Sequence, residues 1–387
     1  MERESKLLIA ALRSAVAGDR IGVWEDVDWV RFVSLARVHH VEALACYGIK
    51  REPQVWEMLP DETRRYLVGT YRQAVYIDVQ FDYLKQQIRL RLERAGVRHI
   101  FLKGAVLKRD YPVPALRTMC DLDVLVCAGD LAKIEEISRG MGGKAEAGDG
   151  NHKSFVFPGG IKVEFHPNLL HHDAPVGTGI NPGWQYAKPD GEPFSVELTQ
   201  EGVYLHTICH LAEHFVSGGV GVRFVLDVWV NRYLRKPAFD PDVADAELRR
   251  LGLLAFARNI EALADCWFGG DMCTPLLSEM GEYILTSGAH GTGDRAMLNA
   301  VALSPGKNRI SALWKKAFYS REEMEDRFIW LRGRPWLMPA AWCLRVIRAV
   351  VHRGPLILKW GKGTGFTREE VSAQREKLAG FGIISEM

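Results

Sequence analysis

The stretch HIFLKGAVLKRDYPVPALRTMCDLDVLV, residues 99–126, decides how the rest of the chain is interpreted. It starts with an apolar run, breaks at a Lys-Gly pair and ends in an Asp-x-Asp segment with apolar neighbours. In a β-strand successive side chains point to opposite faces, so Asp121 and Asp123 share one face while Leu122 and Val124 share the other. Two carboxylates on one face repel each other, and the pattern therefore predicts a bound cation. Mg²⁺ (or Mn²⁺) prefers such oxygen ligands and commonly shares them with substrate phosphates.

A third carboxylate follows in a second expected strand, residues 161–166. Glu164 and His166 share one face of this strand, and the apolar residues between them share the other. The strand follows residues 154–157 across a Pro-Gly-Gly turn, which predicts a hairpin. If it lies beside the Asp121 strand, three carboxylates converge. Three are enough to hold two metal ions for an in-line displacement at phosphorus.

A glycine-containing turn, an Asp-x-Asp strand and a carboxylate on a later strand resemble the DNA polymerase β nucleotidyltransferase superfamily. More narrowly, LKGAVL…YPVPALRTMCDLDVLV resembles a family of bacterial proteins described as uncharacterised nucleotidyltransferases. The hallmark of that family is a Lys-Gly turn, an Arg and an Asp-x-Asp-hydrophobic strand, matched here by Lys103, Gly104, Arg117, Asp121 and Asp123. The resemblance extends over about residues 1–235. The usual superfamily turn is Gly-Gly or Gly-Ser, whereas this chain has Lys-Gly-Ala.

The resemblance implies an enzyme that moves a nucleoside monophosphate from an NTP to an acceptor and releases pyrophosphate. It implies that Asp121 and Asp123 hold both metal ions. Glu164 would complete the acceptor-side metal site and help to deprotonate the acceptor hydroxyl. The acceptor stays open among a sugar phosphate, an antibiotic-like amine or alcohol, a protein hydroxyl and RNA.

The same resemblance makes Lys103 and Arg117 candidate contacts to the phosphates. Gly104 would let the backbone approach the triphosphate, because glycine has no Cβ. A non-enzymatic alternative is a catalytically inactive core that serves as a nucleotide-binding module.

The composition is that of an ordinary globular protein, with 47% hydrophobic and 25% charged residues. The net charge of +2 gives no general preference for an anionic partner. The seven cysteines are odd in number and form no C-x-x-C pair, which favours a reducing compartment and a cytoplasmic location. The N-terminus lacks the apolar region of a signal peptide, and no apolar run reaches the length of a transmembrane segment.

The order of elements predicts an α+β fold, with a small mixed sheet between N-terminal and C-terminal helical regions. The expected elements are helices at 4–18, 26–48 and 60–95, a strand at 98–102, a helix at 104–110, a strand at 121–126, a helix at 130–140 and the hairpin. The predicted divisions are a helical region 1–95, a nucleotidyltransferase core 96–198, a helical domain 199–326 and a C-terminal region 327–387. Residues 167–198 are rich in Pro, Gly and Asn, which is typical of a linker or a flexible lid.

A helix that opens at Thr199 carries His206, His210 and His214 on one face. These histidines are interpreted either as a metal or phosphate site or as a buried polar stripe. His210, Glu213 and His214 also form the H-x-x-E-H pattern of zinc hydrolases, in which two histidines bind zinc and the glutamate acts as base. The alternative function is therefore a zinc-dependent hydrolase, with Glu282 as the possible third ligand.

The segment 327–368 has nine Lys or Arg residues, four Trp and no acidic residue. Basic residues interleaved with aromatics suit an anionic surface, either nucleic acid or lipid. The alternative is an amphipathic helix whose Trp face packs on the core while the basic residues stay in water.

Overall fold

The computed structural model describes most of the chain. The described residues are 2–22, 24–146, 152–171, 174–233, 239–289, 291–303, 334–344 and 366–384, together with 324, 331 and 347. Most of the basic segment 327–368 lies outside these residues, so its anionic contact stays a prediction.

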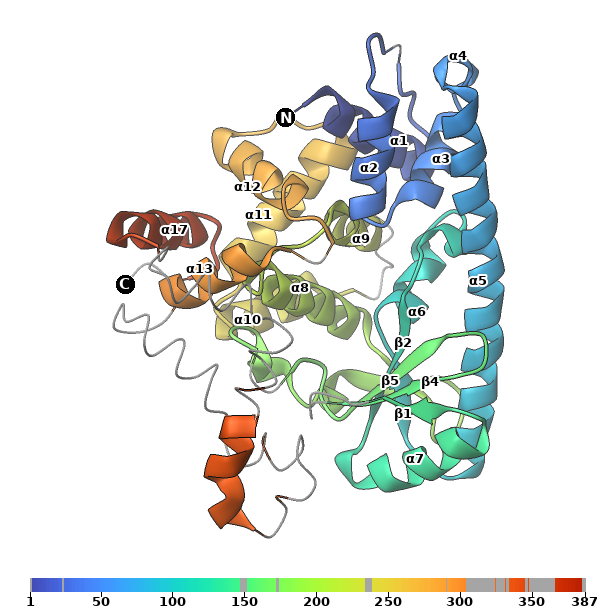
Figure 1. Cartoon of the computed structure of the whole chain (residues 1–387), viewed down its shortest axis with the longest axis vertical. Helices are drawn as coiled ribbons and strands as arrows, with labels where there is room; N and C mark the ends of the chain where they lie inside the picture. The colour runs from blue at the N-terminus through green and yellow to red at the C-terminus, as the bar shows by residue number, and fades with distance from the viewer. Residues whose placement is uncertain are drawn as a thin grey trace.

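The N-terminal part consists of helices, the last of which is very long (Figure 1). They are α1 (Arg3–Ala17), α2 (Trp29–Val38), α3 (Glu42–Lys50), α4 (Pro53–Met58) and α5 (Asp61–Arg94). The single helix predicted for 26–48 is wrong, because the chain turns at His40, which has a left-handed φ of 55°. Apolar residues keep a helical spacing on both sides of this turn, and periodicity alone does not reveal it.

A five-stranded mixed sheet follows, as predicted for an α+β fold. Its strand order is β1-β2-β5-β4-β3, and β2 and β5 are its parallel pair. The strands are β1 (His99–Phe101), β2 (Asp121–Val126), β3 (Lys144–Ala145), β4 (Lys153–Val156) and β5 (Lys162–His166). The helices of this part are α6 (Gly104–Leu107) and α7 (Leu131–Gly140).

The two faces of the sheet have different environments. Leu122, Val124 and Val126 of β2 belong to a core that also holds Phe81, Leu84 and Ile88 of α5 and Ile134 of α7. In Figure 1, α5 runs along one side of the sheet and α7 lies at its end. Because side chains alternate along a strand, the acidic residues of β2 face the opposite side, away from α5. The prediction that Leu122 and Val124 point into the core is confirmed.

A buried lysine attaches the segment after β1 to α5. The ammonium of Lys108 lies 2.7 Å from an Asp78 oxygen and 2.6 Å from an Asp82 oxygen. Asp78 and Asp82 are one helical turn apart, so a single lysine bridges both. This contact holds the α6 turn, and with it the site described below, against the long helix.

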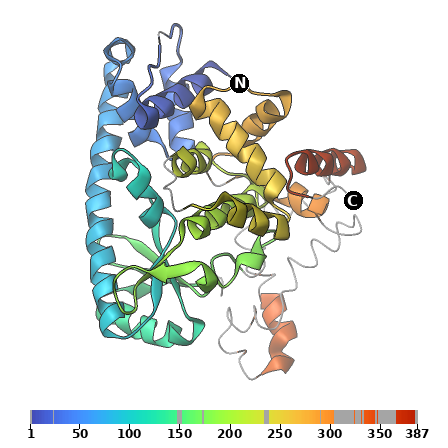
Figure 2. The same ribbon diagram turned by 180° about the vertical axis from the view of Figure 1, so that it is seen from behind.

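From residue 200 onwards the described residues are mainly helical, and they lie on the side of the sheet away from α5 (Figure 2). Its described helices are α8 (Gln200–Val216), α9 (Val222–Tyr233), α10 (Pro241–Arg250), α11 (Leu254–Ala264), α12 (Pro275–Leu285), α13 (Gly293–Leu303) and α17 (Arg368–Gly380). The predicted start of α8 is confirmed, since the Thr199 hydroxyl caps it by accepting from the Gly202 N–H. One hydrophobic core joins α1 and α3 to α8, α9, α11 and α12. None of the described helices is both long and apolar enough to cross a membrane.

Residues 167–198, predicted as a linker or lid, contain a small antiparallel hairpin. Its strands are β6 (Ala187–Pro189) and β7 (Val196–Leu198). Ser195, just before β7, forms a bridge to His99 of β1, so this segment is attached to the edge of the main sheet. The proposed domain divisions stay predictions.

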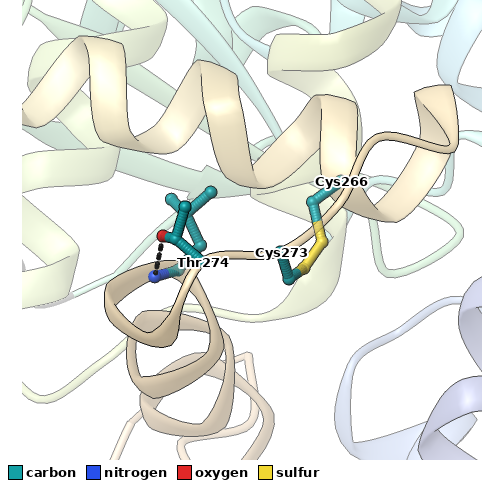
Figure 3. Close-up of a disulfide and its surroundings, with 4 residues drawn as sticks. Cys266, Cys273 and Thr274 are labelled. Carbon is teal, nitrogen blue, oxygen red and sulfur yellow. Dashed lines mark hydrogen bonds between the residues drawn. A yellow bond between two sulfur atoms is a disulfide. The ribbon is translucent and has the colours of Figure 1, made fainter.

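Cysteine spacing alone indicates no disulfide, but the structure joins Cys266 and Cys273 (Figure 3). They are seven residues apart in sequence, and their Cα atoms lie 5.4 Å apart because the chain reverses between α11 and α12. Thr274 follows directly, and its hydroxyl accepts from the Leu277 N–H to cap α12. The disulfide therefore closes a short loop at the start of α12.

Candidate active site

The three predicted carboxylates meet on the face of the sheet that α5 leaves open. In the parallel pair β2–β5, Asp123 stands beside Glu164. Asp121, Asp123 and Glu164 each offer a carboxylate oxygen within 4.8 Å of the others. The sequence predicted this convergence on the condition that the two strands are neighbours, and that condition is met. Three hard oxygen donors at this spacing fit a divalent cation.

Positive groups surround the buried carboxylate of Asp123, which is 3% exposed. The Lys103 ammonium lies 2.7 Å from Asp123 Oδ1, and His166 Nε2 lies 2.9 Å from the same oxygen. Burial alone would raise the pKa of Asp123, but Lys103 and His166 outweigh it and hold that pKa well below its usual range. Asp123 is therefore ionised at neutral pH.

Glu164 is ionised for a similar reason. Lys162 lies 2.6 Å from its Oε1, and His152 and His166 each lie 3.4 Å from one of its oxygens. Burial raises the pKa of Glu164, but hydrogen bonds from His152, His166 and Lys162 bring it well below its ordinary value. The same contacts with Asp123 and Glu164 outweigh burial at His166 and raise its pKa.

Lys103 occupies a strained position in the turn between β1 and α6. Its φ of 48° and ψ of −124° are unusual for a residue with a side chain. The turn is held by the Lys103 carbonyl, which accepts from the N–H groups of Val106 and Leu107. Strained backbone of this kind clusters at functional sites, where it aims a side chain. Here it aims the ammonium at Asp123.

Gly104 packs closely against Met119. A Cβ at this position would lie 2.5 Å from the Met119 Cγ, so a larger residue would require the Met119 side chain to move. The predicted approach of its backbone to a triphosphate stays a prediction.

Arg117 lies in a buried ion pair at the edge of the site. Its Nη2 is 2.6 Å from Asp227 Oδ2, its Nε is 3.0 Å from Oδ1, and the Tyr111 hydroxyl donates to Oδ1 at 2.7 Å. Arg117 is 9% exposed and Asp227 2%. Its role as a phosphate contact stays a prediction.

Loss of Asp227 should destabilise the fold strongly. Asp227→Ala leaves the Arg117 guanidinium buried without its counter-ion, and we expect a loss of about 3–5 kcal/mol in the free energy of unfolding. Urea denaturation measures it. As a control, Glu135→Ala removes the surface partner of both Arg139 and Lys153 and should cost at most about 1 kcal/mol. Equal effects of the two changes would contradict the structural importance of the buried pair.

These groups line a cavity of about 560 Å³ between the sheet and the C-terminal helices. One wall is formed by the carboxylates and Lys103, and another by His206, His210 and His214 of α8. The predicted sharing of one helix face by these histidines is confirmed, with ring centroids 5.8 and 4.4 Å apart. Burial lowers the pKa of His206 to about 3 and that of His210 well below its ordinary value, so both are neutral.

Comparison with known proteins decides the family. A family model described as an uncharacterised nucleotidyltransferase matches residues 25–269, which is more than half of the chain. The chain belongs to this nucleotidyltransferase family. The matched range includes the whole sheet, the three carboxylates and the histidine face of α8. Comparisons with curated proteins and with solved structures give no match.

The geometry of the histidines in this nucleotidyltransferase does not favour the alternative function of a zinc-dependent hydrolase. Within the described part of the chain, the groups of His, Cys, Asp and Glu that could hold a metal are Asp121-Asp123-Glu164 and His152-Glu164-His166. His210 and His214, the two histidines of H-x-x-E-H, lie 2.9 Å apart at Nε2 and bond to each other.

We therefore expect the purified nucleotidyltransferase to hold no stoichiometric zinc. Elemental analysis of the protein after dialysis measures this. One zinc per chain that disappears in His210→Ala would reverse the conclusion. Zinc that disappears instead in His152→Ala would point to the group around Glu164.

Sequence reasoning missed His152, whose ring lies 5.0 Å from that of His166. The hairpin register contains the signal, because Lys153 pairs with Phe165 and the residue before it therefore falls opposite His166. The Pro-Gly-Gly turn predicts the hairpin, and the same pairing continued to the far end of the hairpin places residue 152 opposite His166.

Cation binding should depend on pH through Asp121. Burial, and then the neighbouring Asp123, raise the pKa of Asp121 from 3.8 to about 6. A raised pKa in the folded state stabilises the fold at low pH, and this contribution is lost as the pH rises through 6. A divalent cation bound at Asp121 would replace that proton.

The rise in melting temperature caused by Mg²⁺ should therefore be small at pH 5 and large at pH 8. Thermal unfolding with and without MgCl₂ at both pH values measures it. In Asp121→Asn, which cannot titrate, the difference between the two pH values should largely disappear. An equal Mg²⁺ effect at pH 5 and pH 8 in the wild type would contradict the prediction.

Proposed function

We propose that this nucleotidyltransferase moves a nucleoside monophosphate from an NTP to an acceptor, with release of pyrophosphate and with Mg²⁺ or Mn²⁺ as cofactor. The observation that carries the proposal is the convergence of three ionisable carboxylates, within 4.8 Å of one another, on the wall of a cavity that also presents a lysine. The family membership supports the transfer of nucleotidyl groups.

In this proposal the carboxylates are metal ligands. Asp121 and Asp123 hold both cations, and Glu164 completes the acceptor side. When bound, the two cations neutralise charge on the phosphates and help to deprotonate the acceptor. The depressed pKa values of Asp123 and Glu164 support this role, because ionised ligands need no prior loss of a proton.

Lys103 and His166 are proposed to balance the negative charge of these carboxylates and to orient them. The Lys103 ammonium lines the cavity while it bonds to Asp123, so it can donate to a phosphate oxygen from the same position. His166 donates to Asp123 and orients that carboxylate. His206 and His210 of α8, which are neutral, can form uncharged hydrogen bonds with a substrate in the cavity.

The test uses α-labelled NTPs with Mg²⁺ or Mn²⁺. The purified protein is incubated with each NTP and with representatives of the acceptor classes: sugar phosphates, amino alcohols, protein hydroxyls and RNA. We expect pyrophosphate release and label transfer that require the divalent cation. NTP binding that requires the cation but gives no pyrophosphate with any acceptor would instead favour a nucleotide-binding module.

A further inference from the structure

The corner of the cavity next to Asp121 has an excess of positive charge. Two guanidinium groups, Arg117 and Arg223, lie there and both donate to the Thr118 carbonyl, at 3.1 and 2.9 Å. Asp227 is the carboxylate that neutralises this corner. Both of its oxygens are occupied by Arg117, and one of them also accepts from Tyr111. Among the described residues, the ion pair in this corner therefore joins Asp227 to Arg117 and not to Arg223.

Arg223 is the guanidinium of this corner that has no ion pair among the described residues. Within the residues that the structure describes, no carboxylate oxygen lies within ion-pair distance of its guanidinium. Its hydrogen bonds there run from Nη1 to the carbonyl and hydroxyl of Thr118, which leaves Nε and Nη2 available. Arg223 is half-buried and lines the cavity. Burial, and then the like charge of Arg117, lower its pKa.

A half-buried guanidinium that lacks a carboxylate partner is stabilised by a bound anion. Its planar fork of N–H groups matches phosphate oxygens better than the point charge of a lysine does. The Thr118 carbonyl that anchors it is three residues before Asp121, and three residues of extended chain span at most about 11 Å. The remaining donors of Arg223 therefore belong to a side chain that lines the same cavity as the carboxylates.

We infer that Arg223, rather than Arg117, supplies the guanidinium that binds the phosphate tail of the nucleotide. The inference rests on the proposed function only in taking a nucleoside triphosphate as the ligand. Arg117 is then a positioning residue: Asp227 neutralises it, and it shares the Thr118 carbonyl with Arg223. A metal–triphosphate complex matches both walls, with the cations at the carboxylates and the phosphate oxygens at Arg223.

The experiment measures binding of inorganic tripolyphosphate to the full-length protein by calorimetry, with EDTA present, so that it needs neither metal nor transfer. We expect Arg223→Gln to weaken binding by about 10- to 100-fold, the loss typical of a charged hydrogen bond. Arg223→Lys keeps the charge but loses the forked N–H groups, so its affinity for tripolyphosphate should lie between those of the wild type and Arg223→Gln. Arg139→Gln, which removes an exposed arginine of α7, should bind as the wild type does.

AMP binding in Mg²⁺ separates a phosphate contact from general damage to the fold. It should be equal in the wild type and Arg223→Gln, because AMP lacks the outer phosphates. If the Gln variant does not fold, Arg223→Lys takes its place. Equal tripolyphosphate affinity in the wild type and the folded variant, or equal losses for AMP and tripolyphosphate, would overturn the inference. Arg223-dependent binding without any NMP transfer would leave it standing and reject the proposed reaction.

Discussion

Asp123→Asn should abolish the cation-dependent binding of NTP and stop nucleotidyl transfer. Asp123 is the central carboxylate of the site. It is nearly fully buried and stands beside Glu164. Its carboxylate also accepts hydrogen bonds from Lys103 and His166. Asparagine keeps the shape but removes the charge and one metal-binding oxygen. Loss of a single electrostatic contact in an active site costs about 10²–10³-fold in rate. Loss of a ligand that two cations share should lower the rate at least as much.

The measurement is the melting temperature of wild type and variant with NTP and Mg²⁺, together with pyrophosphate release. The wild type should show a rise in melting temperature that needs both NTP and Mg²⁺, and the variant should show none. Asp271→Asn, an exposed change outside the cavity, is the matched control and should behave as the wild type. An NTP–Mg²⁺ shift that survives unchanged in Asp123→Asn would remove this residue from the site.

Glu164→Gln should separate binding from chemistry. The nucleotide-side cation is proposed to depend mainly on Asp121 and Asp123, so NTP affinity should stay nearly intact. Transfer should fall by about 10²–10⁴-fold, because the acceptor loses the group that helps to remove its proton.

Two assays are run in parallel on wild type and Glu164→Gln: NTP binding by calorimetry, and transfer of α-labelled NTP to the acceptor or to water. Glu136→Gln, an exposed change on α7, controls for loss of a negative charge. Transfer at the wild-type rate in Glu164→Gln would show that the carboxylate triad is incorrect. The third ligand would then be sought at Asp149 or Asp173, which lie outside the described residues.

Local sequence patterns were sufficient for much of the core. The alternation in 121–126 predicted a strand with both acids on one face, and β2 spans those residues. The Pro-Gly-Gly turn predicted the hairpin, and the apolar spacing of 60–95 predicted α5. These features depend on neighbours within a few residues, where side-chain alternation and helical periodicity act directly. For the same reason the resemblance to nucleotidyltransferases could be based on a short stretch.

Only the tertiary structure decided which distant groups meet. No local pattern shows that β5 pairs with β2 in parallel, because α7 and β4 intervene along the chain, and the triad depends on that pairing. Arg117 illustrates the same limit. From its sequence position it is a free cation near the acids, but Asp227, 110 residues away, neutralises it. Within the described part of the chain, Arg223 is then left without a carboxylate partner. Charge balance in a buried site is set by packing between remote elements, so a residue's type and spacing give its chemistry, whereas its partners come from the fold.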